Sequence, residues 1–177
     1  MFLDADRHPV ARTLEDHWLE IREEMRALRR EDYESIADPL IVQGCWVGLG
    51  VFDSLDPMRA HRWRHNAAAC PRTVAVLSRI EGLQVSAFLL MTPATRLCPH
   101  RDMQDPRFLN FLIALDGGSD AWMRVGAERR VHANGRCVVF DPREEHEAGN
   151  DGPQDRVALF AAVGFDAARC PARPSGS

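Results

Sequence analysis

The stretch AWMRVGAERRVHANGRCVVFD, residues 121–141, decides the fold that we expect for this chain. It contains three short runs separated by turn residues, with Gly126 between the first two and Asn134-Gly135 between the last two. Asn-Gly is a strong signal for a two-residue hairpin turn. Short strands at this spacing are typical of a sandwich or barrel. The three predicted strands are Ala121–Val125, Glu128–His132 and Arg136–Asp141.

The strand pattern continues on both sides of this stretch. Three further strands are predicted: Gln84–Thr92, Arg107–Leu115 before the turn Asp116-Gly117-Gly118, and Arg156–Phe165. Residues 36–83 are mixed. There the apolar run Leu40–Phe52 indicates one or two strands, and Pro71 begins a short helix that Gly82 ends.

An amphipathic helix is expected near the N-terminus, with Thr13 as its N-cap. Its apolar stripe consists of Leu14, Trp18, Ile21, Met25 and Leu28. We therefore predict one domain over residues 1–177, with helical or mixed support in 1–83, a β-barrel core in 84–165 and a flexible tail in 166–177. The expected class is mainly β, a jelly roll with N-terminal and flanking helices.

Composition excludes several classes of function. The chain has 177 residues, 45% of them apolar and 27% charged, which suits one globular domain. All 22 basic residues are Arg, so neither a Schiff-base lysine nor a P-loop lysine is available. A net charge of -4 argues against a nucleic-acid partner. No apolar run approaches the roughly 20 residues of a membrane span.

The cysteine content and the N-terminus indicate a compartment. Five cysteines without a C-x-x-C pair fit reduced thiols better than a disulfide framework. The first residues, MFLDADRHPV, lack the apolar segment of a signal peptide. We therefore expect a cytoplasmic protein.

Two histidines and one carboxylate form the strongest functional pattern. His100 and Asp102 are two residues apart, so in an extended segment their side chains point to the same face, and His146 supplies a second imidazole. This composition is the 2-His-1-carboxylate facial triad of non-heme Fe(II) oxygenases, and we predict that these three residues bind iron. Two alternatives stay open. Asp102 could be a turn carboxylate paired with Arg101, and Cys98 could be a further ligand or a buried thiol.

Arg156 lies ten residues after His146 and opens the last predicted strand. An Fe(II) dioxygenase of this type also holds 2-oxoglutarate, whose far carboxylate needs a bidentate partner of permanent charge. We expect Arg156 to be that partner, with a surface ion pair as the alternative. The basic segment Arg59–His65, around Trp63, is interpreted as solvated, with an acidic ligand or a nucleic acid as the alternative.

An ordered set of short motifs runs through most of the chain. The motifs are His17-Trp18, Ile21-Arg22-Glu23-Glu24, Ala27-Leu28, Asn66, Cys70-Pro71-Arg72-Thr73, Leu77, Ile80, Gly82-Leu83, Val125-Gly126, Glu128, Arg130, Gly135, Val139-Phe140-Asp141 and His146-Glu147. The set resembles the aspartyl/asparaginyl β-hydroxylases, a family of Fe(II)/2-oxoglutarate dioxygenases on a double-stranded β-helix. Arg156 falls where this family places its 2-oxoglutarate arginine. The resemblance implies the family's fold and its iron chemistry.

The chain departs from the family's pattern close to the expected site. The best-known animal members have Gly where this chain has Asp102, so Asp102 restores the full triad. The family's Pro-Gly before the first ligand is Pro93-Ala94 here. His132 stands where the family tends to have Trp, and we expect it to be structural.

The strand after the first ligand also differs. By register, Leu109 and Phe111 replace an Arg and a His that face the family's pocket, so we expect a less polar pocket. Arg107 lies on the same alternating face and is expected to bind a carboxylate of the cosubstrate or of the substrate. The resemblance implies an Asp- or Asn-like substrate, and the less polar pocket leaves room for another amino acid such as proline or an aliphatic one.

These features together predict an Fe(II)/2-oxoglutarate-dependent hydroxylase that acts on an unactivated C–H bond. Its expected partner is a small molecule or peptide that carries a carboxylate, free or bound to a carrier. The alternative is a cupin-type metal-binding protein with a non-oxidative or ligand-binding role. Arg156 discriminates between the two, because a cupin without 2-oxoglutarate needs no arginine there. The oligomeric state stays open.

Overall fold

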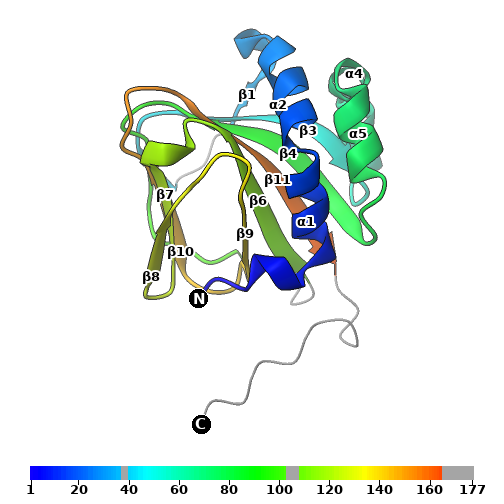
Figure 1. Cartoon of the computed structure of the whole chain (residues 1–177). Coiled ribbons are helices and arrows are strands. Elements are labelled where there is room, and N and C mark those ends of the chain that lie inside the picture. The colour runs from blue at the N-terminus through cyan, green and yellow to red at the C-terminus, as the bar shows by residue number, and fades with distance from the viewer. Residues whose placement is uncertain (37–39, 103–107, 165–177) are drawn as a thin grey trace.

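The computed structural model describes residues 1–36, 40–102 and 108–164. Their strands form two antiparallel sheets that face each other (Figure 1). The six-stranded sheet contains, in spatial order, β1 (Glu34–Ser35), β3 (Trp46–Asp53), β4 (Leu83–Met91), β11 (Arg156–Gly164), β6 (Phe108–Asp116) and β9 (Cys137–Phe140). The five-stranded sheet contains β2 (Ile41–Gln43), β5 (Arg96–Leu97), β10 (His146–Asn150), β7 (Ala121–Val125) and β8 (Glu128–Val131). This arrangement confirms the mainly β, jelly-roll class.

The α-helices are α1 (Pro9–Asp16), α2 (Trp18–Ala27), α3 (Pro57–Arg62), α4 (Arg64–Ala69) and α5 (Pro71–Leu77). Helices α1, α2 and α5 cover the outer side of the six-stranded sheet, whereas α3 and α4 contact β3, and Trp63 between them reaches the cavity side (Figure 1). Short 3-10 turns lie at Ala5–Arg7, Arg30–Asp32 and Gly118–Asp120. The helix expected at Pro71 is confirmed as α5, whereas the segment Arg59–His65 is helical, divided between α3 and α4. The helices leave the inner face of this sheet turned toward the five-stranded sheet.

The N-terminal segment forms two helices rather than the single helix that we expected. His17 has φ −111° and ψ 8°, outside helical geometry, and it separates α1 from α2. Pro9 occupies the first position of α1, where its fixed φ favours a helix start. Thr13 lies inside α1 and its hydroxyl donates to the Pro9 carbonyl at 3.0 Å, so Thr13 is not an N-cap. The apolar stripe is nevertheless buried, with Leu14 and Ile21 fully enclosed.

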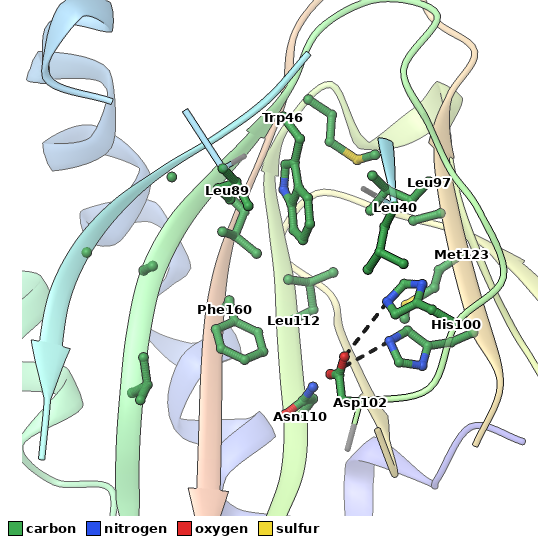
Figure 2. A pocket seen from close by; sticks show the side chains of 18 of the residues that line it. Leu40, Trp46, Leu89, Leu97, His100, Asp102, Asn110, Leu112, Met123 and Phe160 are labelled. Carbon is green, nitrogen blue, oxygen red and sulfur yellow. Dashed lines mark ion pairs between the residues drawn. The ribbon is translucent and has the colours of Figure 1, made fainter. Parts of the chain in front are cut away.

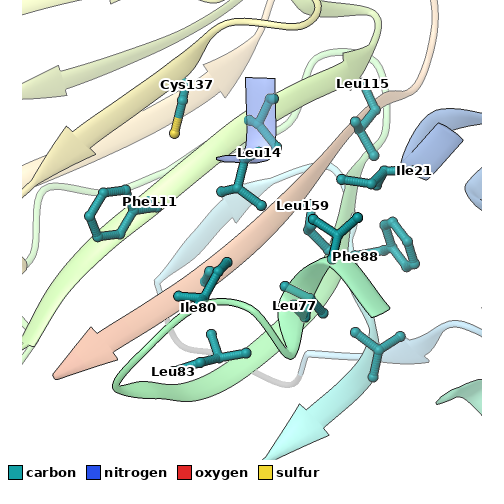
Figure 3. Packing of buried hydrophobic residues seen from close by; sticks show 14 of the residues in the cluster. Leu14, Ile21, Leu77, Ile80, Leu83, Phe88, Phe111, Leu115, Cys137 and Leu159 are labelled. Atoms are coloured by element: carbon teal, nitrogen blue, oxygen red, sulfur yellow. The ribbon is translucent and has the colours of Figure 1, made fainter. Parts of the chain in front are cut away.

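A dry core lies between these helices and the outer face of the six-stranded sheet (Figure 3). Leu14 and Ile21 from the helices join Phe88, Phe111 and Leu159 from three central strands, and none of these side chains is accessible to solvent. Full burial of one such side chain contributes roughly 1.5–3 kcal/mol. This core fixes the sheet on which the candidate site is built.

The carboxylate of Glu24 in α2 holds the start of α5. One of its oxygens accepts from the Arg72 backbone N–H at 2.8 Å, and the other accepts from the backbone N–H and the hydroxyl of Thr73, both at 2.7 Å. Burial acts to raise the pKa of Glu24, but these hydrogen bonds outweigh it and the pKa lies below its ordinary value. The sequence motif that ends at Glu24 therefore contacts the motif Cys70-Pro71-Arg72-Thr73 directly.

Asn134-Gly135 does not form the expected hairpin. β8 pairs with β7, whereas β9 pairs with β6 in the other sheet, so the chain crosses between the sheets at this point. Asn134 Oδ1 accepts from the Gly118 N–H at 3.0 Å, and Gly135 has φ +77°, a conformation that glycine tolerates. The hairpin lies one turn earlier, at Gly126, between β7 and β8. An Asn-Gly pair specifies a local turn, but the pairing of the strands beside it depends on distant partners.

Some of the remaining expectations concern residues that the structure describes, and others do not. The six strands predicted over 84–165 are observed with bounds that differ by about one residue, whereas β1, β5 and β10 were not predicted. The four described cysteines, Cys45, Cys70, Cys98 and Cys137, are free thiols. Within the described ranges, no helix combines the length and the apolar character needed to cross a bilayer. Arg107 and the tail 166–177 lie outside the described residues, and the division of the chain into one domain stays a prediction.

Candidate metal centre

Two adjacent backbone segments bring the two histidines together. β10 begins at His146, and His100 forms an isolated bridge with it a few residues after β5. Each backbone N–H donates to the other residue's carbonyl, at 2.9 and 2.8 Å. The centroids of the two imidazole rings are 4.1 Å apart. Strand pairing therefore places two side chains that are distant in the sequence at one point on the barrel.

Backbone carbonyls orient both imidazoles. Nδ1 of His100 lies 2.8 Å from the Cys98 carbonyl oxygen, and Nδ1 of His146 lies 2.9 Å from the Glu144 carbonyl oxygen. Because a carbonyl only accepts, we assign the proton to Nδ1, which leaves a free lone pair on Nε2. Metal-binding histidines are usually fixed in this manner. Cys98 thus contributes its carbonyl oxygen, and its thiol is not part of the cluster.

Asp102 completes a triangle with the two free nitrogens. Its Oδ1 lies 3.9 Å from Nε2 of His100 and its Oδ2 lies 3.9 Å from Nε2 of His146, as the dashed lines of Figure 2 mark. These separations are too long for hydrogen bonds and leave space for an ion among the three groups. One donor atom from each residue lies within 4.8 Å of the others.

The alternative partner of Asp102 lies elsewhere. Nη1 of Arg101 donates to the carbonyl of Arg143 at 3.1 Å, and the backbone N–H of Asp102 donates to the carbonyl of Pro142 at 2.9 Å. The Asp102 carboxylate is therefore directed at the histidines, and its backbone is fixed by the loop that precedes β10.

The electrostatic environment favours a neutral His146. Burial is the largest influence and lowers the pKa of His146 below its ordinary value, against the opposing effect of the hydrogen bond to Glu144. A neutral imidazole is the form that binds a metal ion. The donor set of two imidazoles and one carboxylate thus suits Fe(II).

Arg156 is the first residue of β11 and is almost completely buried, with 3% of its surface exposed. Burial lowers its pKa to about 10, so the guanidinium is still charged at neutral pH. Within the described ranges, no carboxylate pairs with it, and its Nε has no hydrogen-bond partner. Its other nitrogens contact the Met91 sulfur at 3.7 Å and Nδ1 of His132 at 3.2 Å. A buried cation without a counter-ion is costly unless an anion binds beside it.

His132 is a candidate functional residue that the sequence did not reveal. Its Nδ1 must accept from Arg156, since a guanidinium only donates, so the proton is placed on Nε2. Burial, with Arg156 beside it, lowers the pKa of His132 well below its ordinary value and keeps the ring neutral. The only signal in the sequence is that this position departs from the family's Trp.

The inner face of β6 differs by one residue from the expected one. Asn110 and Leu112 face the cavity, whereas Leu109 and Phe111 belong to the dry core on the helical side. Side chains alternate along a strand, so an error of one residue in register exchanges its two faces. The expectation that Leu109 and Phe111 line the pocket is therefore wrong. Asn110 is buried and its Oδ1 has no partner among the described residues, which makes it a second candidate that the sequence did not reveal.

A cavity of about 360 Å³ connects these groups between the two sheets (Figure 2). The three metal-type donors, Arg156 and Asn110 line one part of it, and the rest of its lining is mostly apolar. Its size falls in the range of small-molecule sites, roughly 300–1,000 Å³.

The turn before the first ligand is strained. Ala94 has φ +59° and is the one non-glycine residue with a positive φ in the described part of the chain. It follows Pro93 in a turn that the Thr95 N–H closes by donating to the Thr92 carbonyl at 3.2 Å. A left-handed alanine costs roughly 1–2 kcal/mol. This strain explains why glycine is favoured at this position of the family's pattern.

Fold and side chains define a class of protein: a jelly-roll barrel that gathers two histidines, one carboxylate and one buried arginine around an internal cavity. The comparison of the sequence with known families gives a match over residues 15–164 to the family described as "Aspartyl/Asparaginyl beta-hydroxylase". The chain therefore belongs to the aspartyl/asparaginyl β-hydroxylase family, and this membership indicates a hydroxylase.

Individual relatives are more distant. Over 97 residues the chain is 32% identical to an ornithine lipid ester-linked acyl 2-hydroxylase of Rhizobium tropici. The match covers 54% of this chain and 34% of that protein, so the chain spans about a third of the length of the curated relative.

Solved structures share the fold. A prolyl-4-hydroxylase from Pseudomonas putida is similar with a TM-score of 0.52 at 15% identity, over 92% of this chain and 91% of that one. A cupin-2 domain protein from Rhodospirillum rubrum has a TM-score of 0.49 at 9% identity, over 75% and 68% of the two chains. The similarity to the prolyl-4-hydroxylase shows a common fold alone and carries no information about the substrate.

Proposed function

We propose that this chain is an Fe(II)/2-oxoglutarate-dependent hydroxylase. The observation that carries the proposal is that one cavity contains both the three metal-type donors and the Arg156 guanidinium, which has no carboxylate partner among the described residues. A cupin with a non-oxidative role would explain the three donors but would leave the buried cation unexplained. An anionic cosubstrate that binds the metal and also pairs with Arg156 explains both the three donors and the buried cation.

Each residue of the site has a distinct role in this proposal. His100 and His146 would bind Fe(II) through Nε2 and Asp102 through its carboxylate, which leaves three coordination positions open on one side. Arg156 would bind the far carboxylate of 2-oxoglutarate through its planar guanidinium. The proposal that Arg107 binds a second carboxylate rested on the face of Leu109 and Phe111, and it loses that support because this face belongs to the dry core.

When bound, iron and 2-oxoglutarate would supply the oxidising chemistry, in which O₂ would provide one oxygen atom to succinate, with release of CO₂, and the other to a substrate C–H bond. The protein's own residues position and shield the reactants. The carbonyls that accept from the two Nδ1–H groups keep the imidazoles oriented. Leu112, Met123 and Phe160 line the cavity near the donors and exclude water from it.

The substrate is proposed to carry a polar head derived from a carboxylic acid, next to the carbon that is hydroxylated. The family's name refers to aspartyl and asparaginyl groups, and the Rhizobium tropici relative is named for the acyl group of an amino-acid lipid. Both kinds of molecule carry a carboxyl-derived group close to a C–H bond. Free thiols at the described cysteines support a reducing compartment, the cytoplasm, as the proposed location.

Replacement of His146 by Ala tests the metal site. We expect Fe(II) affinity to fall by more than the roughly 100-fold that loss of an outer-shell partner can cost. Succinate formation from 2-oxoglutarate should disappear with it. Anaerobic equilibrium dialysis measures the first effect, and succinate quantification measures the second.

His61→Ala, at an exposed position of α3, is the matched control and should leave both quantities unchanged. Unaltered iron uptake by His146→Ala would refute the assignment. Tight iron binding without any consumption of 2-oxoglutarate in the unmodified protein would favour the non-oxidative cupin instead.

A further inference from the structure

The cavity continues well beyond the candidate metal centre, along the inner face of the six-stranded sheet. We define the apolar arm as the part lined by Trp46, Gly48, Gly50, Trp63, Ala87 and Leu89. Figure 2 shows Trp46 and Leu89 on the side of the cavity away from Asp102. The arm therefore leads from the reacting end of the cavity toward β3.

The floor of the arm is smooth because two neighbouring strands carry small residues there. In the sheet register Gly50 is paired with Ala87, and Gly48 is paired with Leu89. A Cβ at Gly48 would meet Ile36 at 3.2 Å, and one at Gly50 would overlap the Trp63 ring. Trp63 therefore lies directly against the backbone of β3 and forms the end wall of the arm.

The length of the arm follows from the sheet. Cavity-lining residues occur on β6, β11, β4 and β3, which are four consecutive strands of the six-stranded sheet. Three inter-strand spacings of about 4.8 Å correspond to roughly 14 Å. A single amino acid is too short to extend over this distance, whereas an extended aliphatic chain is long enough.

The chemistry of the arm excludes a charged occupant. Apart from the metal-type donors and Arg156, the one charged side chain among the described lining residues is Glu34, which is exposed on β1 at the edge of the sheet. The row of Gly50 and Ala87 contains neither Arg156, which lies in the row of Trp46 and Met91, nor Glu34, which is paired with Gly48. A charged group placed over this row would lose its hydration without gaining a partner. A hydrocarbon chain there would lose only unfavourable contact with water.

We infer that the apolar arm binds the unbranched aliphatic chain of an acylated substrate, with the polar head of the substrate at the metal centre and the end of the chain at Trp63. The inference rests on the proposed function and specifies its substrate class as an amphiphile. Hydroxylation is then directed to a carbon close to the polar head. The chain acts as the anchor, and longer chains fill the arm toward Trp63.

Binding to the metal-free protein tests the inference separately from catalysis. N-acyl amino acids with one head group and saturated chains of increasing length are titrated by calorimetry, below the concentrations at which they self-associate. Each methylene that enters the arm should tighten binding about fourfold, until the arm is full and the affinity reaches a plateau. An affinity that does not change with chain length would overturn the inference.

Two variants should move the plateau in opposite directions. Ala87→Leu narrows the arm and should shift the plateau to shorter chains, whereas Trp63→Ala removes the end wall and should shift it to longer ones. Ala68→Leu makes the same change of size on an exposed face of α4 and should leave the plateau in place. Opposite shifts cannot come from general misfolding, and an identical plateau in all three variants would place the chain elsewhere.

Catalytic turnover then distinguishes the two proposals. Binding that depends on chain length, but without hydroxylation when iron and 2-oxoglutarate are supplied, would refute the proposed function and leave the role of the apolar arm standing. Hydroxylation of free amino acids with no advantage from an acyl chain would support the proposed function and overturn the role of the apolar arm. Hydroxylation near the head group that improves with chain length is the expected result.

Discussion

The six-stranded sheet has a buried charge on each of its two sides, and the two charges are accommodated differently. On the helical side, the Glu24 carboxylate accepts four hydrogen bonds from Arg72 and Thr73, one of them from the Arg72 guanidinium. On the cavity side, the Arg156 guanidinium has no carboxylate partner among the described residues, and its Nε has no acceptor. A compensated charge contributes to folding, whereas an uncompensated one costs several kcal/mol. The helical side is therefore built for stability, and the cavity side retains a cost that a bound anion would offset.

The largest change in stability is expected on the helical side. Phe111→Ala should lower the free energy of unfolding by about 3–5 kcal/mol, because Phe111 is fully buried in the dry core. Leu112→Ala, on the next residue but facing the cavity, should cost about 2 kcal/mol because it only enlarges an existing space. Urea denaturation measures both. Equal losses would mean that the two faces of β6 are packed alike.

Arg156→Met should separate stability from function. The requirement for 2-oxoglutarate should rise about 100-fold, or about 3 kcal/mol, while the free energy of unfolding stays constant or increases, because a desolvated charge has been removed. Cosubstrate titration and thermal denaturation of the same preparation give the two values. Arg62→Met, exposed at the end of α3, is the control and should change neither. Unchanged affinity for 2-oxoglutarate in Arg156→Met would contradict the role.

Glu24→Gln should destabilise the protein by about 1.5–3 kcal/mol at neutral pH, because the four donors of Arg72 and Thr73 lose a charged acceptor. The pKa of Glu24 in the folded protein lies below its ordinary value of 4.5. Its contribution is therefore complete above that value and is lost as the pH falls through the folded-state pKa. The difference between wild type and variant should shrink in acid, as urea titrations over a pH series would show. Glu23→Gln, at an exposed neighbour, should show little effect at any pH.

The smallest effect is expected for His132, which positions Arg156 without lining the cavity. His132→Phe removes the acceptor and should raise the KM for 2-oxoglutarate about tenfold, or about 1.4 kcal/mol, with kcat unchanged. His132→Asn, which keeps an acceptor, should restore part of the loss. If kcat falls in both variants while the KM stays constant, His132 does not act through the cosubstrate.

Several features of the fold could be predicted because they depend on local chemistry. Six of the strands in 84–164 followed from apolar runs and from turn residues such as Gly126, whereas β5 and β10 were not predicted. The helix after Pro71 followed from its start and stop signals. His100, Asp102 and His146 were recognisable as a set because two residues along an extended segment share a face. Their side chains indeed converge. Arg156 was recognisable from its distance to His146 and is buried in the same cavity.

The sequence by itself thus determined most of the longer strands, although not β10, and it determined which side chains have the chemistry of a metal and anion site. Only the tertiary structure decided that Asn134-Gly135 joins two different sheets, that Asn110 rather than Phe111 faces the cavity, and that His132 contacts Arg156. The physical reason is the range of the forces involved. Turn conformation and side-chain alternation are fixed within a few residues, whereas strand partners and the choice between the two faces of a strand depend on what the distant parts of the chain bury.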